Sequence, residues 1–212
     1  MSRHLIGNDA FQEVDIVGIT RSITKYGVTV RNREDLGRIL KEAFYIARTG
    51  RPGPVLIDLP KDVMGELGSA EYPETVNIRG YKPNTSVHIG QLKRAIKCLD
   101  VQKKPLFLAG GGVIISRANE VFTKLVEKTN IPVVTTVMGR GAIPTNHPLY
   151  IGNLGMAMEH MPAIWLSVIV ICCFQSELGS MNRITGKLHS FAPNAQIVHI
   201  DIDTAAISKM YR

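Results

Sequence analysis

The sequence has few of the residues and segments that mark secreted, membrane-spanning or metal-binding proteins. It holds three cysteines in 212 residues, and the adjacent Cys172 and Cys173 make neither a disulfide framework nor a Cys-x-x-Cys metal pair. The longest apolar run, residues 168–174, is far short of the roughly 20 residues of a membrane span. The opening MSRHLIGNDAF lacks the apolar core and cleavage site of a secretory signal. We therefore expect reduced thiols, a cytoplasmic location and no membrane partner.

Metal-ligand spacing and base-stacking aromatics are also missing. None of the six histidines stands in an HxxxH or HxH pair, so we expect no metal site made by this chain. The net charge is +7, but the basic residues are scattered over two predicted helices, and no aromatic residues interleave with them. We interpret them as a solvated surface and expect no nucleic-acid partner.

The composition is that of an ordinary globular protein. Hydrophobic residues make up 45% of the chain and charged residues 20%, which is enough to build a real core. Asn32 is expected to cap a helix that Gly50 ends, and the apolar residues between them recur at helical spacing: Leu36, Ile39, Leu40, Ala43, Phe44 and Ala47. Residues 54–59 (PVLIDL) predict a strand buried on both faces.

The remainder of the chain alternates helices and strands. Residues 65–86 are rich in Gly, Pro and polar residues without periodicity, which predicts a linker and a domain boundary. Beyond the linker, we expect helices over about 87–99, 117–129 and 183–191 and strands over 105–109, 131–137, 168–174 and 196–202. This alternation predicts an α/β fold with a Rossmann-like parallel sheet.

Three motifs at predicted strand ends can carry chemistry. The run 110–112 (GGG) follows one strand and allows close approach of a ligand phosphate, although a tight turn explains it equally. The run 135–139 (TTVMG) ends the next strand, where open α/β sheets bind ligands; alternatively Val137 and Met138 belong to the core. Asp201 and Asp203 end the last strand, where a carboxylate takes ribose hydroxyls or, equally, caps the next helix.

Three segments together resemble one enzyme family. Residues 7–26 (GNDAFQEVDIVGITRSITKY), 49–63 (TGRPGPVLIDLPKDV) and 196–209 (QIVHIDIDTAAISK) are similar to thiamine-diphosphate enzymes, closest to the acetolactate (acetohydroxyacid) synthases. The resemblance implies that residues 1–64 are the C-terminal part of an α/β pyrimidine-binding domain. It also implies that 65–86 are a linker and that 87–212 are a central FAD-binding or nucleotide-binding domain truncated at its C-terminus. The family's catalytic glutamate and its Gly-Asp-Gly metal motif are not found, so we expect the middle third of an enzyme, inactive alone.

The resemblance implies an activity, cofactors and partners. The parent reaction is condensation of two pyruvates, or of pyruvate with 2-oxobutyrate, in branched-chain amino acid biosynthesis. It uses thiamine diphosphate, Mg²⁺ and a flavin (FAD) that does no net redox chemistry, and we expect at most weak FAD binding here. Small 2-oxo acids are the substrates, and the parent is expected to be a homo-oligomer with a regulatory subunit. The alternatives are a related pyruvate oxidase or oxo-acid decarboxylase, a non-catalytic nucleotide-binding or dimerisation module, or an inactive truncated product.

The same resemblance assigns candidate site residues by matching motif. Substrate-channel positions fall on Phe11, Gln12 and Lys61, for which a helix cap (Gln12) and a solvated lysine (Lys61) are the simpler explanations. Arg51 matches a flavin contact, although a surface arginine is the alternative. The other flavin contacts implied are Gly111, Gly112, Thr136, Val137, Met138, Leu154, Gly155, Met156, Asp201 and Ile202.

The resemblance breaks between Met156 and Arg183. The family pattern GMHGTYASN…DLL…GARFDDR is replaced by AMEHMPAIWLSVIVICCFQSELGSMN. Codons for 157–182 can be written that, read two bases later, give His-Gly-Thr-Tyr-Ala and finish on Phe-Asp-Asp. We interpret this stretch as the family motif read out of frame; true divergence is the alternative, and sequencing the encoding DNA decides between them. As written, the chain lacks the arginine and paired aspartates that hold the flavin in this family.

Overall fold

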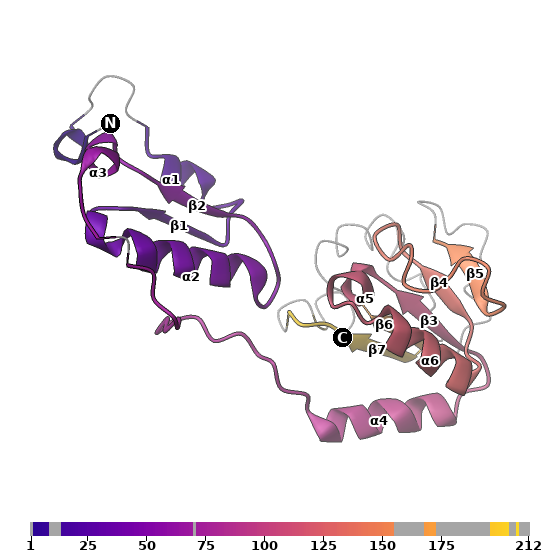
Figure 1. Ribbon diagram of the computed structural model, residues 1–212. Coiled ribbons are helices and arrows are strands. Elements are labelled where there is room, and N and C mark those ends of the chain that lie inside the picture. Colours follow the sequence, from indigo (N-terminus) through magenta and orange to yellow (C-terminus); the bar gives the residue numbers. More distant parts are fainter. Residues whose placement is uncertain are drawn as a thin grey trace. The chain divides into compact units, whose positions relative to one another are not determined.

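The chain forms two compact units, residues 1–84 and 85–212. The computed structural model describes residues 2–8, 14–69, 71–154, 168–172, 196–203 and 207, without the side chains of Leu5 and 168–172 (Figure 1). The division falls inside the predicted linker. The first unit contains these elements: η1 (Arg3–Leu5), α1 (Ile16–Thr20), β1 (Tyr26–Thr29), η2 (Arg33–Asp35), α2 (Leu36–Arg48), β2 (Val55–Asp58) and α3 (Lys61–Gly65). The second contains these: α4 (Ile89–Asp100), β3 (Pro105–Ala109), α5 (Gly111–Ile115), α6 (Asn119–Thr129), β4 (Val133–Thr135), β5 (Tyr150–Asn153), β6 (Val168–Cys172) and β7 (Gln196–Ile200).

The first unit packs α2 against a two-stranded parallel sheet of β1 and β2. The helix buries one stripe, Ile39, Ala43 and Ile46, at the spacing of successive turns. Phe44 was expected in this stripe but is 61% exposed, because it is about 100° around the helix from Ala43. The helix is preceded by the 3-10 turn η2, and the side chain of Asn32 makes no capping hydrogen bond.

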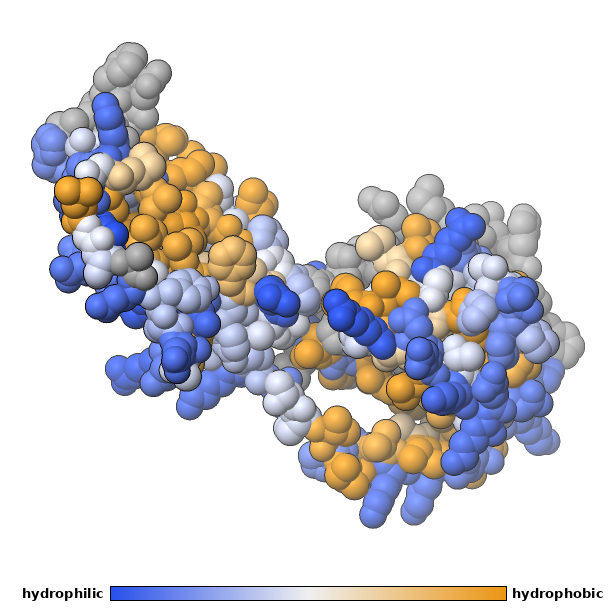
Figure 2. Space-filling model, viewed as in Figure 1, coloured by the Kyte–Doolittle hydropathy of each residue, from blue (hydrophilic) through white to orange (hydrophobic). Residues whose placement is uncertain are grey.

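Strand β2 is half-buried, whereas the sequence predicted a strand buried on both faces. All four of its residues are partly accessible, because among the described residues only β1 pairs with it. Nearby, Val14, Ile19 and Ile23 are 58%, 62% and 71% exposed. Figure 2 shows apolar side chains gathered on the face of this unit that carries α1. An apolar run therefore identified the strand but did not determine how much of it is covered.

The second unit is a five-stranded parallel sheet in the order β5-β4-β3-β6-β7. The order reverses at β3, the central strand, as in half of a doubly wound fold. One face is covered by α6, whose Phe122 meets Phe107 of β3 edge-on at 5.7 Å between ring centroids. Leu99 of α4 and Val198 of β7 pack against the same cluster. The predicted Rossmann-like parallel sheet is confirmed.

Two elements of this unit are absent from the sequence-based prediction. Helix α5 begins at the glycines that were expected only to precede a helix, and Arg117, at φ +56°, separates it from α6. Strand β5 contains Gly152 at φ +142° and pairs with β4 through a register shift, so its apolar alternation is interrupted. The helix expected over 183–191 lies outside the described residues. Within the described residues, no helix is long and apolar enough to span a membrane.

Candidate functional site

The carboxyl edge of the second sheet is the natural place for a ligand. The strand order reverses at β3, with β4 on one side and β6 on the other, and open α/β sheets bind ligands outside the strand ends at such a point. Strand β3 ends at Ala109, and the chain turns through Gly110 into α5. Gly111 and Gly112 are buried there. Both glycines of the predicted flavin site therefore lie at the switch point.

The turn after β4 is fixed against the end of β3. The N–H of Thr136 donates to the carbonyl of Ala109 at 3.0 Å. The buried hydroxyl of Thr136 accepts the N–H of Gly139 at 3.0 Å. A Cβ on Gly139 would lie 2.1 Å from the carbonyl oxygen of Ala109, so only glycine fits. The second predicted motif is thereby held beside the first.

Val137 and Met138 are turned toward solvent within this turn. They are 72% and 58% exposed, so the alternative that places them in the core is wrong. Thr135 and Thr136, which precede them, are buried. The end of β4 thus presents two adjacent apolar side chains beside the glycine turn of β3, which is suitable for contact with an apolar part of a ligand.

Strand β5 brings Leu154 to the same edge. The N–H of Leu154 donates to the carbonyl of Thr135 at 2.8 Å, and its side chain is buried. The phenol of Tyr150 donates to Oδ1 of Asn153 at 2.8 Å, and the Thr135 hydroxyl bonds to both side chains. Leu154 is therefore a neighbour of the Thr136 turn. Gly155 and Met156, the next two predicted flavin contacts, lie outside the described residues.

Asp201 stands at the end of β7, two strands away from β3 in the sheet. Its Oδ1 accepts the N–H of Asp203 at 2.8 Å, so the carboxylate shapes the turn that follows the strand. Its side chain is only 2% exposed, and Oδ2 faces Nε2 of His199 at 3.7 Å. Ile202 is partly buried beside it. The structure therefore shows that Oδ1 of Asp201 stabilises the turn after β7. Binding of a ribose by this carboxylate stays a prediction.

In the first unit, Arg51 follows α2 in an anchored loop. Nζ of Lys25 donates to the carbonyl of Thr49 at 2.8 Å and to the phenol of Tyr81 at 3.1 Å. The Tyr81 phenol in turn donates to the Thr49 carbonyl at 2.8 Å. This cation satisfies carbonyls at the C-terminal end of the helix. Gly50, at φ +56°, then turns the chain into the exposed Arg51.

Lys61, at the start of α3, is exposed, and Phe11 and Gln12 lie outside the described residues. The neighbouring Asp62 is held by Arg3, whose Nε donates to Oδ2 at 2.8 Å and whose N–H donates to Oδ1 at 3.0 Å. Arg3 also pairs with Glu66. The hydrogen bond from the Arg3 side chain is the main cause that lowers the pKa of Asp62 from 3.8 to about 2.

This ion pair gives a pH prediction. Because the pKa of Asp62 is lowered in the folded state, the contact stabilises the chain above pH 3.8 and is lost as the pH falls through about 2. The ¹³C shift of the Asp62 carboxyl should titrate with a midpoint near 2. In Arg3→Met the midpoint should return toward 3.8. A midpoint that is the same in both proteins would contradict the contact.

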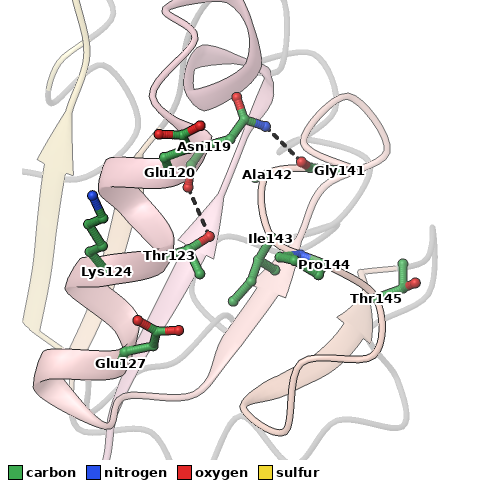
Figure 3. A pocket seen from close by; sticks show the side chains of 10 residues that line it. All are labelled: Asn119, Glu120, Thr123, Lys124, Glu127, Gly141, Ala142, Ile143, Pro144 and Thr145. Carbon is green, nitrogen blue, oxygen red and sulfur yellow. Dashed lines mark hydrogen bonds between the residues drawn. The ribbon is translucent and has the colours of Figure 1, made fainter.

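A separate hollow of about 550 Å³ lies between α6 and the chain at 141–145 (Figure 3). Asn119 spans its upper end by donating to the carbonyl of Gly141 at 2.7 Å. Glu120, Thr123, Lys124 and Glu127 of the helix are among the residues that line it. None of the residues predicted from the sequence lines this hollow. Among the described residues, no three His, Cys, Asp or Glu side chains are grouped to hold a metal ion.

Residues 92–212 match the family described as thiamine pyrophosphate enzyme, central domain. The chain belongs to the thiamine pyrophosphate enzyme family. The matched segment contains the whole five-stranded sheet and every predicted flavin contact except Arg51. The resemblance seen in the sequence is thereby confirmed at the level of the family.

Individual relatives of this thiamine pyrophosphate enzyme chain are acetolactate synthases. It is 46% identical over 211 residues to the acetolactate synthase of Mycobacterium bovis, covering 99% of this chain and 34% of that protein. It is 42% identical over 207 residues to the acetolactate synthase isozyme 3 large subunit of Escherichia coli K12, covering 97% and 36%. The large subunit of Haemophilus influenzae is 42% identical over 212 residues, with the same shares. The chain therefore spans about a third of the length of these relatives.

Sequence reasoning missed several residues that shape these sites. Lys25 and Tyr81 are 56 positions apart, and no local pattern links them. Gly139 was noticed only as the last residue of the 135–139 motif, and its contact with β3 is tertiary. His199 was counted among the histidines without a role. The family motif at 196–209 could have pointed to His199, because this residue is separated from the predicted flavin contact Asp201 by only one position.

Proposed function

We propose that these 212 residues are part of an acetolactate synthase, which joins two pyruvates into 2-acetolactate with release of CO₂. Similarity over 97–99% of the chain to acetolactate synthases supports this proposal. In such an enzyme thiamine diphosphate supplies the carbanion chemistry, and Mg²⁺ anchors its diphosphate. The protein binds and orients the substrates and excludes water.

We also propose that the second unit is the flavin-binding central domain of that enzyme. The observation that carries this proposal is the exposure of Val137 and Met138 at the switch-point edge of the sheet. Two large apolar side chains there suit an aromatic ring, and the buried Gly111 and Gly112 leave room for a close approach of the ligand backbone. The described residues at this edge therefore fit a nucleotide that has a flat apolar part.

Each remaining residue has a proposed role. Thr136, Leu154, Asp201 and Ile202 belong to the same flavin edge, with Gly155 and Met156 following Leu154. The family resemblance alone supports Arg51 as a cationic partner for the flavin and supports Phe11, Gln12 and Lys61 as residues that line the substrate channel.

The names of two relatives also suggest partners. The proteins of Escherichia coli and Haemophilus influenzae are named large subunits, which supports a smaller regulatory subunit as a partner of the whole enzyme. We propose, in addition, that the enzyme is a homo-oligomer and that its substrates are small 2-oxo acids.

A charged residue at position 137 tests the flavin proposal. We expect FAD to bind weakly, and Val137→Asp to lower the affinity at least tenfold, because a carboxylate would face the apolar ring. Val101→Asp is the matched control, since Val101 is 73% exposed and lies between α4 and the start of β3, at the opposite, amino edge of the sheet. Quenching of flavin fluorescence measures both, in the chain as it stands and with 157–182 replaced by the shifted reading. Equal effects of the two substitutions, or no binding in any version, would refute the proposal.

A further inference from the structure

A histidine and an aspartate form a buried pair at the carboxyl end of β7. Because they are two positions apart, His199 and Asp201 project from the same face of the sheet. Their side chains are 13% and 2% exposed, and Nε2 of His199 lies 3.7 Å from Oδ2 of Asp201. The other carboxylate oxygen, Oδ1, is already engaged by the N–H of Asp203 at 2.8 Å. One oxygen is therefore fixed by the backbone, and the other faces an imidazole.

The imidazole nitrogen needs a partner. Nε2 of His199 is buried and makes no hydrogen bond with any residue that the structure describes. A buried polar group without a partner is unfavourable, and the facing carboxylate oxygen can only accept. Shortening the gap from 3.7 Å to a normal hydrogen bond of about 2.9 Å satisfies both groups. This requires the proton to be on Nε2.

We propose that His199 is a positioning residue that holds the carboxylate of Asp201 toward the flavin. The His199 Nε2–H donates to Oδ2 of Asp201, while the N–H of Asp203 donates to Oδ1. With both oxygens held from the protein side, the carboxylate keeps one orientation at the carboxyl end of β7, the edge at which the proposed flavin binds. The inference rests on the proposed flavin-binding function, because Asp201 is a flavin contact only in that proposal.

A second histidine in the same unit provides a matched control. Nδ1 of His147 accepts the N–H of Leu149 at 3.2 Å, so its proton is on Nε2, which faces Glu127 at 3.9 Å. Glu127 is 60% exposed, and His147 precedes β5 at the opposite, amino edge of the sheet. The two imidazoles thus face carboxylates in a similar way, but only His199 is at the proposed ligand edge.

The first measurement needs no flavin. Long-range ¹H–¹⁵N spectra of the chain should show His199 with its proton on Nε2. Asp201→Asn should shift the His199 nitrogen signals and leave those of His147 unchanged. A proton on Nδ1 of His199, or no response to Asp201→Asn, would overturn the inference irrespective of any ligand.

The second measurement tests whether the contact between His199 and Asp201 affects the affinity for FAD. His199→Leu should weaken FAD binding about fivefold or more, whereas His199→Gln should stay within about twofold, because its amide places an N–H close to the position of Nε2. In an Asp201→Asn background the effect of His199→Leu should vanish. The control His147→Leu should not change the affinity. Circular dichroism confirms that each variant is folded.

The outcomes separate this inference from the proposed function. Flavin binding that is weakened by Val137→Asp but indifferent to His199→Leu contradicts this inference alone. Equal weakening by His199→Leu and His199→Gln shows a packing role and also contradicts it. Absence of flavin binding in every version of the chain refutes the proposed function, and the positioning role falls with it.

Discussion

Replacing Gly139 by alanine should destabilise the second unit by about 3 kcal/mol. The new Cβ would lie 2.1 Å from the carbonyl oxygen and 2.8 Å from the carbonyl carbon of Ala109. Both atoms belong to the backbone of the central strand, which cannot rotate away as a side chain can. Inserting a methyl group into such a contact falls at the upper end of the overpacking range.

The measurement is thermal unfolding followed by circular dichroism. A loss of about 3 kcal/mol lowers the melting temperature of a unit of this size by roughly 10 °C. Gly90→Ala is the matched control, because its Cβ would meet only the side chain of His88, at 3.0 Å, and because alanine favours the helix α4. It should leave the melting temperature unchanged or raise it slightly. If both variants melt together, the turn at 136–139 is not packed on β3 in the way described.

The sequence predicted the positions of the strands better than it predicted which side chains are buried by their neighbours. Strand β3 was predicted with its observed bounds, because an apolar run stands between Pro105 and a glycine turn. Helix α5 and strand β5 were missed, since Gly111 and Gly152 interrupt the patterns that identify a helix or a strand. Exposure was misjudged at Phe44 for a different reason. Hydrophobicity gives the tendency of a side chain to be buried, whereas the neighbours that bury it are set by the tertiary structure.

The candidate site was predictable where it depends on strand ends. The motifs at 110–112 and 135–139 follow two strands, and parallel strands place their carboxyl ends at one edge. The contacts that fix the site could not be predicted in this way. Lys25 and Tyr81 both donate hydrogen bonds to the carbonyl of Thr49, although these three residues are far apart in the sequence. His199 and Asp201 face each other because they lie on the buried face of their strand. Both are consequences of packing.

The second large effect concerns residues 157–182. Transplanting residues 1–212 into the Escherichia coli relative, in place of its matching 207 residues, supplies the remaining two thirds of an acetolactate synthase. With 157–182 as they stand, we expect a chimera that retains little FAD and forms no acetolactate. With the shifted reading, which restores Phe-Asp-Asp before Arg183, both should return. One regained charge-assisted hydrogen bond, worth about 1.5–3 kcal/mol, raises FAD affinity roughly tenfold to more than a hundredfold.

The most direct test of the central claim is acetolactate formation by these two chimeras. The assay supplies pyruvate, thiamine diphosphate, Mg²⁺ and FAD, and uses only preparations that are monodisperse and folded by circular dichroism. A third chimera, with the shifted reading and Val137→Asp, should again lose bound flavin, which ties the activity to the switch-point edge. The account predicts acetolactate from the shifted-reading chimera and none from the chimera with 157–182 as they stand. A folded shifted-reading chimera without flavin or product would contradict the claim that this chain is the middle part of an acetolactate synthase.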